Sequence, residues 1–327
     1  MPENKIDSTN QIYNFCTIFD SNYFSKGLAL YFSLEKVCKF HLFIFTSEEK
    51  CFRLLKERNL INATIINIEI VEDENLVDIK SSRNKGEYYW TIKSYCIEYL
   101  FETYYLDTVT YVDADTFFYS SPEPFFNELG SNSVLITPHN FSPKYKREIK
   151  NGIYNAGYIT FRNTEVGIKA LNWWKEKCTE WCFIKKEDGK FGDQLYLNTL
   201  SSFEGVHILR HRGTLANWNV QQYRFIKTDK SIEGITHSNK KFRVVFYHFH
   251  YLKFYDSAEV ELGRKHLSEE VFELFYKPYI RFLYELAPQG PHGSGKKPLN
   301  WKTPILFIQR KINETYNIIP LSNIISP

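Results

Sequence analysis

Short apolar runs alternate with amphipathic segments along the first third of the chain. The pattern predicts strands at residues 12–19, 40–45 and 63–70, and helices at residues 23–37, 48–58 and 88–104. The strands have the short apolar runs of a buried sheet, and the helices have apolar residues at helical spacing. Such alternation is typical of a parallel sheet with right-handed crossover helices. We therefore expect residues 12–115 to form a nucleotide-binding half.

The most informative stretch is a β-branched run, residues 108–112, that ends in Asp113 and Asp115. A continuous apolar run is typical of a strand buried on both faces. Carboxylates at i and i+2 of an extended chain point to the same side, where they repel unless they share a proton or hold a hard cation such as Mg²⁺ or Mn²⁺. Ligands of open α/β sheets bind beyond the carboxyl ends of the strands. The alternative is an acidic turn, because Asp is common where strands end.

The pattern changes after residue 116. It predicts strands at residues 133–137, 153–161, 206–209 and 243–249, and helices at residues 165–182, 191–200 and 268–286. The strand at 153–161 is expected to be interrupted by Ala156 and Gly157, since glycine inside a strand often marks the close approach of a ligand or another backbone. We assign residues 116–260 to an acceptor and sugar half.

The C-terminal part begins with a strongly amphipathic helix at residues 268–286, which completes a domain expected to span residues 1–287. Residues 288–298, rich in Gly and Pro, have the composition of a linker. Residues 299–327 mix apolar and basic side chains, so this tail could dock on the domain, on a partner or on a membrane surface. Docking on its own domain is the simplest expectation.

Composition narrows the class of protein. Hydrophobic residues make up 43% and aromatic residues 17% of the chain, as expected of a globular protein, and a net charge of +3 does not favour nucleic acid as a partner. The six cysteines lack a paired CxxC spacing, which favours reduced thiols. The polar N-terminus does not resemble a signal peptide, and no apolar run reaches the roughly 18 residues that span a bilayer. We expect a cytoplasmic protein.

Two histidines could complete a metal site. His248 and His250 lie two residues apart on a predicted strand, so they share a face that could converge with Asp113 and Asp115. An imidazole beside two carboxylates favours Mn²⁺ over Mg²⁺. Either histidine alone is more simply explained as a satisfied side chain near a loop.

Two enzyme classes use an acid pair after a buried strand. In a sugar-nucleotide transferase the acids hold a cation that stabilises the departing nucleotide. In a phosphatase like the haloacid dehalogenases, Asp113 would attack phosphorus, and Asp113-Ala114-Asp115-Thr116 fits that Asp-x-Asp-x-Thr pattern. However, that motif usually opens its domain, whereas three strand and helix units come first here. The later Gly-Asp-x-x-x-Asp is also missing, because Asp193 is followed four residues later by Leu197.

Five blocks of the chain, in matching order between residues 12 and 253, resemble the GT-A glycosyltransferases, specifically bacterial nucleotide-diphospho-sugar transferases of the family 8 type. The blocks are Thr17–Tyr23, Asp113–Asp115, Asn155–Gly157, Gly192–Asn198 and His248–Phe249. The resemblance implies a Rossmann-like GT-A fold: a mixed, mostly parallel central sheet flanked by helices, with a C-terminal helical extension. It also implies a hexosyltransferase that moves a sugar from a nucleoside diphosphate, with UDP expected, to a hydroxyl group.

The resemblance further implies roles for individual residues. The metal, Mn²⁺ or Mg²⁺, would be held by Asp113, Asp115 and either His248 or His250. Asp193 and Gln194 would lie at the anomeric carbon as catalytic residues. The donor would be bound by Thr17, Phe19, Asp20, Tyr23, Lys93, Asp113, Ala114, Asn155, Gly157, Trp218, Asn219 and Lys253. Within this set, Tyr23 would stack on the base and Asp20 would hydrogen-bond to it.

One block departs from the family pattern. The glycine expected two residues after Phe249 is Tyr251, and Lys253 comes one residue early, which puts the diphosphate contact of this loop in question. The expected acceptor is a glycan or glycolipid in cell-surface polysaccharide synthesis, with the tail as a candidate peripheral contact at the inner face of the membrane. The alternative from another class is a sugar-nucleotide-binding protein that has lost turnover.

Overall fold

A computed structural model describes residues 11–229, 231–288, 290, 295–296, 308 and 310–325, so most of the predicted linker and the start of the tail lie outside the described residues. The centre is a seven-stranded sheet in the order β3-β2-β1-β4-β7-β6-β8. Its strands are β1 (Tyr13–Ile18), β2 (Phe40–Thr46), β3 (Ala63–Asn67), β4 (Thr108–Val112), β6 (Val134–Pro138), β7 (Tyr154–Arg162) and β8 (Val206–Ile208).

The sheet is mixed and mostly parallel, which confirms the expected fold class. Strands β3, β2, β1 and β4 pair in parallel, and so do β6 and β8, whereas β7 runs antiparallel between β4 and β6. Strand β7 continues through Ala156 and Gly157, but its pairing with β6 is interrupted there, as the sequence predicts. Ile136 pairs with Ile159 and Thr137 with Asn155, so the extra residues at the register shift, 156–158, lie on β7.

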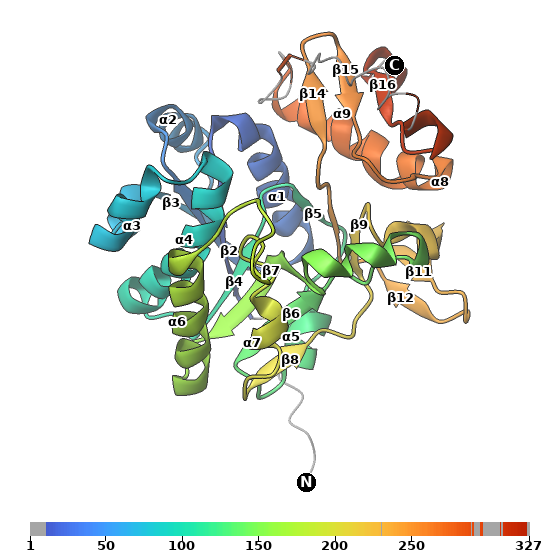
Figure 1. Ribbon diagram of the computed structural model, residues 1–327. Coiled ribbons are helices and arrows are strands. Elements are labelled where there is room, and N and C mark those ends of the chain that lie inside the picture. The colour runs from blue at the N-terminus through green and yellow to red at the C-terminus, as the bar shows by residue number, and fades with distance from the viewer. Residues whose placement is uncertain are drawn as a thin grey trace.

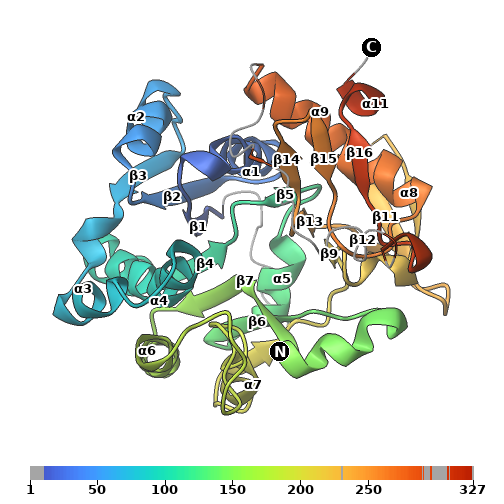
Figure 2. The same cartoon turned by 45° about the horizontal axis from the view of Figure 1, so that its top comes forward.

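Helices cover both faces of this sheet, and Figure 2 shows α3, α4 and α6 on one side with α1 and α5 on the other. The helices are α1 (Phe24–Val37), α2 (Glu49–Glu57), α3 (Glu74–Lys80), α4 (Lys85–Tyr104), α5 (Glu123–Leu129), α6 (Glu165–Glu180) and α7 (Leu197–Leu200). Each face buries its own apolar cluster, and α4 begins at a capping box in which Asn84 and Glu87 bond reciprocally to the backbone.

Several element boundaries differ from the prediction. The helix expected at residues 191–200 begins only at Leu197, because Gly192 adopts a left-handed φ of 53° that a right-handed helix cannot contain. The strand expected to reach residue 70 ends at Asn67, whose side chain accepts a hydrogen bond from the Glu69 amide and starts a 3₁₀ turn. The seven-residue helices α3 and α5 are too short to show a clear period and were not predicted.

A smaller three-stranded sheet lies beside the end of β4. It contains β5 (Thr116–Phe118), β13 (Phe246–His248) and β9 (Thr214–Ala216). Strand β13 runs antiparallel to β5, so that His248 pairs with Thr116, the residue that follows the acid pair. This pairing brings the end of a late strand to the carboxyl end of β4. The predicted strand at 243–249 is thus shorter than expected.

The later elements form two further sheets with their helices, and Figure 1 shows β14, β15, β16, α8 and α9 at the upper right and β11 and β12 below them at the right. They include β10 (Arg224–Lys227), β11 (Ile232–Ile235), β12 (Lys241–Arg243), β14 (Lys253–Tyr255), β15 (Glu259–Glu261), β16 (Ile318–Pro320), α8 (Glu269–Val271), α9 (Lys277–Leu286) and α11 (Ser322–Ile325). The predicted helix at 268–286 is α8 and α9 joined by a π-helical turn, Phe272–Tyr276.

The described end of the tail docks on the domain. Strand β16 pairs with β15, and the Arg281 side chain donates to the Ile324 carbonyl oxygen at 2.7 Å. This docking confirms the simplest expectation for residues 318–325. Among the described helices, none combines the length and apolarity needed to cross a bilayer.

Candidate active site

Two carboxylates and one imidazole meet where β4 ends. Asp113, Asp115 and His248 each offer a ligand atom, and these atoms all lie within 4.8 Å of one another. His248 Nε2 lies 3.0 Å from an Asp115 oxygen and 3.7 Å from an Asp113 oxygen. Oxygen and imidazole ligands at this spacing suit a hard or borderline divalent cation. The residues therefore fit the metal that the sequence predicts.

The backbone around the acids is fixed by strand pairing. The Asp113 amide donates to the Gly157 carbonyl oxygen at 2.9 Å, and the Phe249 amide donates to the Asp115 carbonyl oxygen at 2.8 Å. The first bond ties the acid pair to β7 and the second ties it to the end of β13. Because both partners are main-chain groups, the positions of the acids depend on the fold rather than on mobile side chains.

The two candidate histidines differ in their surroundings. Burial by itself would lower the pKa of His248, but the facing Asp115 and Asp113 carboxylates raise the pKa above its usual value. Burial, followed by the neighbouring His248, lowers the pKa of His250 to about 4. The rings of the two histidines lie 5.4 Å apart, and His250 lies outside the group that could hold a metal. The geometry favours His248 as the imidazole ligand.

Gly157 explains why a glycine lies inside β7. A Cβ at this position would lie 2.5 Å from Asp113 Oδ2, 2.6 Å from Asn155 Oδ1 and 3.0 Å from His248 Cε1. A side chain here would therefore push into the acid and imidazole group. The glycine permits the close approach that the sequence suggested.

A buried cation, Lys93 of α4, lies behind the acids. Its Nζ is 2.9 Å from Asp193 Oδ2, 3.4 Å from Asp113 Oδ1 and 3.2 Å from the Ala156 carbonyl oxygen. Lys93 is only 3% exposed, and the two carboxylates raise its pKa against the effect of burial. The Tyr111 hydroxyl donates to the same oxygen, Asp113 Oδ1, at 3.0 Å, and the Tyr111 ring centroid lies 4.6 Å from Lys93 Nζ. Lys93 thus links Asp193 to the metal-facing acid.

Two cavities meet at this cluster. The smaller, about 330 Å³, is lined on its far side by Phe19, Asp20, Tyr23 and Ala114. The larger, about 630 Å³, is lined by Asn155, Gly157, Asp193, Gln194 and Trp218 among others. Five residues line both cavities, and they are Trp90, Lys93, Asp113, His248 and His250. A ligand that fills both cavities therefore passes directly over the candidate metal group.

Residues at the far end of the smaller cavity are held in place by polar contacts. Asp20 Oδ1 accepts a hydrogen bond from the Asn22 amide at 2.9 Å, and Asp20 Oδ2 forms an ion pair with Lys85 at 2.5 Å. The Tyr23 ring is 41% exposed, with Lys26 Nζ 4.2 Å from its centroid. An exposed aromatic face beside a fixed carboxylate offers both stacking and hydrogen bonding to a flat ring.

Three of the predicted donor-binding residues line neither of these cavities. Thr17 is fully buried in β1, and Lys253 is exposed on β14. Asn219 uses its amide to hold the backbone, donating to the carbonyl oxygens of His139 and Thr214 and accepting from the Ala216 amide.

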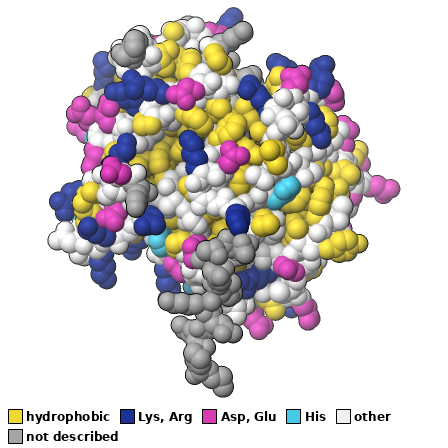
Figure 3. Space-filling model, turned by 180° about the vertical axis from the view of Figure 1, so that it is seen from behind, with side chains coloured by type: hydrophobic (Ala, Val, Ile, Leu, Met, Phe, Trp, Pro, Cys, Tyr) yellow, Lys and Arg dark blue, Asp and Glu magenta, His cyan; other side chains and the backbone are white. Residues whose placement is uncertain are grey.

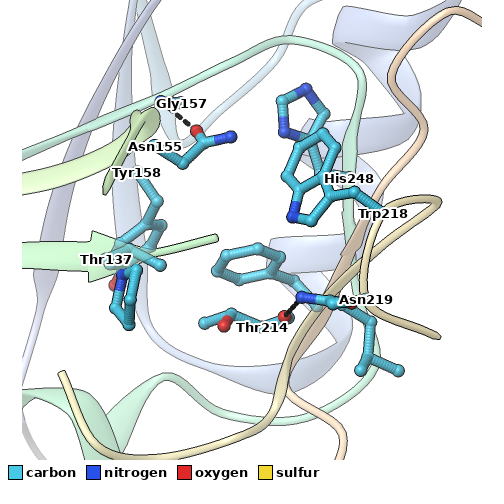
Figure 4. A pocket seen from close by; sticks show the side chains of 11 residues that line it. Thr137, Asn155, Gly157, Tyr158, Thr214, Trp218, Asn219 and His248 are labelled. Carbon is cyan, nitrogen blue, oxygen red and sulfur yellow. Dashed lines mark hydrogen bonds between the residues drawn. The ribbon is translucent and has the colours of Figure 1, made fainter. Parts of the chain in front are cut away.

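Asn219 lies beside a third, very small cavity, shown in Figure 4. This space of about 10 Å³ is bordered by Thr137, Asn155, Gly157, Thr214 and Trp218, among others, and it is far too small for a sugar. Trp218 packs edge-on against His248, with ring centroids 5.5 Å apart at 83°. The loop around Asn219 therefore supports Trp218, which also lines the larger cavity.

The sequence analysis missed several residues of the site. Tyr111 was assigned only to the buried strand. Residues two apart on a strand share a face, so the spacing of Tyr111 and Asp113 is the signal that could have predicted their contact. Trp90 lies almost one turn before Lys93 on α4, a spacing that places both on one face. Arg264 and Lys265 also line the larger cavity, and their loop has no recognisable motif.

Two proteins of Bacillus subtilis are similar in sequence to this chain. No protein-family model matches the chain. The uncharacterized protein YfnF of Bacillus subtilis (strain 168) is 32% identical over 246 residues, which covers 72% of this chain and 80% of YfnF. The uncharacterized protein YfnD of the same organism is 27% identical over 279 residues, covering 82% of this chain and 88% of YfnD.

Solved structures show the same fold. The galactosyltransferase LgtC, in complex with donor and acceptor sugar analogs, is similar with a TM-score of 0.54 at 17% identity, covering 84% of this chain and 96% of LgtC. An active-site mutant of LgtC gives a TM-score of 0.51 at 16% identity. These likenesses show that the chain has the GT-A fold. At 32% identity over 80% of the length of YfnF, the chain belongs to the same family as YfnF.

Proposed function

We propose that the chain is a divalent-metal-dependent glycosyltransferase that moves a hexose-type sugar from a nucleoside diphosphate, with UDP expected, to a hydroxyl of a glycan or glycolipid acceptor. The observation that carries this proposal is the position of Asp113, Asp115 and His248 at the junction of two cavities in a GT-A fold. The donor would lie across the junction, with its nucleoside in the smaller cavity and its sugar in the larger one.

The residues support this division of roles. Tyr23 would stack on the base, and Asp20 would accept a hydrogen bond from it. A bound Mn²⁺ or Mg²⁺ would stabilise the negative charge that develops on the departing diphosphate. Asn155 and Asp193 would border the sugar, with Asp193 held in place by its ion pair with Lys93 at 2.9 Å.

Gln194 also belongs to the sugar end of the site. Its Nε2 donates to the Asn151 carbonyl oxygen at 2.9 Å, which orients the amide along the wall of the larger cavity. In this proposal Gln194 and Asp193 lie beside the anomeric carbon, and they position the donor sugar for attack by the acceptor hydroxyl. The larger cavity has room for the acceptor as well as the donor sugar.

The fold also bears on the alternatives. A phosphatase that uses Asp113 as a nucleophile would be expected in a different fold, and in this chain Asp113 is engaged by Tyr111 and Lys93. An inactive binding protein would retain the same cavities. Donor binding therefore does not separate an enzyme from a binding protein, and the test must measure turnover.

The deciding experiment is slow hydrolysis of the donor. Purified protein is incubated with a panel of sugar nucleotides and Mn²⁺, and release of the nucleoside diphosphate is followed, since transferases commonly lose some donor to water. We expect one donor to be hydrolysed, and Asp115→Asn to remove both the hydrolysis and the Mn²⁺-dependent binding of UDP. Asp78→Asn makes the same chemical change at an exposed position on α3 that lines neither cavity, and it should be silent.

Two outcomes would contradict the proposal. If no donor is hydrolysed and UDP still binds with Mn²⁺, the chain is a sugar-nucleotide-binding protein. If calorimetry shows that Asp115→Asn binds UDP with unchanged metal dependence, the metal site lies elsewhere. Release of phosphate from an aryl phosphate, lost in Asp113→Asn, would instead support the phosphatase.

A further inference from the structure

The charges that line the larger cavity are unevenly distributed along it. At the inner end, Asp113 and Asp193 share the buried ammonium of Lys93. The lining also includes three cations, Lys150, Arg264 and Lys265, and one acid, Glu148. We call these four residues the mouth of the cavity, because Lys150 and Arg264 are exposed to solvent. The mouth of the cavity therefore has an excess of positive charge.

Only one of the three cations at the mouth is neutralised within the cavity. Lys265 forms an ion pair with Glu148 and lies 4.4 Å from the ring centroid of Tyr145. This pair accounts for the one acid at the mouth. The charges of Lys150 and Arg264 are therefore neutralised by groups outside the cavity or by a ligand.

Arg264 has only a weak partner. Its Nε lies 3.7 Å from Glu261 Oε1, and the same carboxylate oxygen is 2.9 Å from Arg310. The Arg264 side chain is 62% exposed, and its guanidinium lies 5.6 Å from the ring centroid of Tyr251. The guanidinium therefore stays available to bind an anion at the mouth.

Lys150 lies at the C-terminal end of a basic 3₁₀ segment, Pro143–Asn151, that forms one wall of the mouth. Within the described chain, its ammonium has no carboxylate partner within ion-pair distance. Lys186 adds further positive charge, because its Nζ donates to the Lys150 carbonyl oxygen at 2.7 Å. The segment that carries Lys150 is therefore basic, and it contacts the loop of Arg264 through the ion pair of Glu148 with Lys265.

Aromatic side chains line the same cavity. They are Trp90, His139, Phe141, Phe191, Trp218 and Tyr251. Flat aromatic faces with a few polar groups are typical of sites that bind an organic ring. The wall thus suits a saccharide that extends from the metal group to the basic mouth.

We propose that the acceptor is an anionic saccharide, whose carboxylate or phosphate group is bound by Lys150 and Arg264 while its reacting hydroxyl reaches the metal group. This inference rests on the proposed function and adds the chemical class of its acceptor. It does not follow from the charge of the whole chain, which is only +3. On the rear face in Figure 3, acidic and basic side chains are scattered together, unlike those at the mouth.

The test compares matched oligosaccharides. The probes are a tetrasaccharide that bears glucuronic acid, the same tetrasaccharide with its carboxylate reduced to an alcohol, and the reduced form carrying a 6-phosphate. Their affinities for the full chain with UDP and Mn²⁺ are measured by calorimetry. We expect at least one anionic probe to bind about 2- to 30-fold more tightly than the neutral one, because two exposed ion pairs contribute on this scale. The preferred probe identifies the anion.

The control variants assign the preference to the mouth. The double variant Lys150→Gln and Arg264→Gln should remove the preference, whereas Lys146→Gln, an exposed change on the same segment outside the cavity lining, should preserve it. The preference should also shrink from about 0.1 M to about 1 M salt, as the screening length falls from about 10 Å to about 3 Å.

Two results would overturn the inference. One is that the neutral and anionic probes bind with equal affinity, or that no probe binds detectably. The other is a preference that survives in the double variant. Because this measurement needs no turnover, failure of donor hydrolysis would refute the proposed transferase while leaving the anion preference as a separate result.

Discussion

Replacing Gly157 by alanine is the most direct test of the candidate metal group. The new methyl group would lie 2.5 Å from Asp113 Oδ2 and 3.0 Å from His248 Cε1. Non-bonded heavy atoms pack best at about 3.5–4.0 Å, so the Asp113 carboxylate must retreat by roughly 1 Å. The backbone of Gly157 is not in the left-handed region, so the effect of the change is steric and local.

The expected loss of metal affinity follows from the narrow range of ligand distances in metal sites. Ligand distances in a metal site hold to within about 0.2 Å, and a displacement of roughly 1 Å is several times larger. Disturbing the groups that orient metal ligands typically costs about 10- to 100-fold in metal affinity. We therefore expect Gly157→Ala to weaken Mn²⁺ binding by about this factor, with a loss of about 1–3 kcal/mol in stability from overpacking.

The assay is a titration in which free Mn²⁺ is counted by electron paramagnetic resonance, with and without UDP. Thermal unfolding reports separately whether the variant is folded. Gly295→Ala is the matched control, because its methyl group meets no described atom within 4 Å. A folded Gly157→Ala protein that binds Mn²⁺ as tightly as the parent would refute the placement of the metal between Asp113 and His248.

Three further changes test neighbouring parts of the site. Lys93→Met should lower the free energy of unfolding by about 3–5 kcal/mol in chemical denaturation, because it leaves the buried carboxylate of Asp193 without its cation. An unchanged denaturation midpoint would argue against the ion pair. Tyr111→Phe removes one hydrogen bond to a charged group. Calorimetry should show losses in the free energies of unfolding and of metal binding that add up to about 1.5–3 kcal/mol. No loss in either quantity would contradict the contact. His248→Ala should abolish Mn²⁺ binding whereas His250→Ala should retain it, and the reverse result would exchange their roles.

Much of the central sheet was predictable because its strands are buried on both faces. Strands β1, β2 and β4 each have continuous apolar runs that contrast with the helices around them. The boundaries failed where a single residue decides the backbone. Gly192 turns left-handed before α7, and Asn67 caps a turn at the end of β3, neither of which periodicity detects.

The metal group was predictable in its chemistry but not in its final ligand. Asp113 and Asp115 follow one strand, so their proximity follows from the spacing alone. The choice between His248 and His250 depended on the register of β13 against β5, which the sequence did not determine. Because the two histidines lie two residues apart, a shift of two residues in that pairing would place His250 where His248 now lies.

The basic mouth of the larger cavity was beyond prediction for a related reason. Lys150 belongs to a 3₁₀ segment and Arg264 to the loop after β15, and they are far apart in the chain. Each of them, taken alone, has the properties of an ordinary surface cation. Only the arrangement of the folded chain places both on one cavity and leaves them without strong carboxylate partners.

The candidate site is assembled across three separate parts of the fold. The acids follow β4, His248 ends β13, and Lys93 comes from α4 on the other side of the sheet. The pairing of β13 with β5 holds the imidazole at the acids, so any change that loosens this small sheet should act on the metal group without touching a ligand. The same sheet carries β9, which precedes Trp218, and it therefore couples the metal group to the wall of the larger cavity.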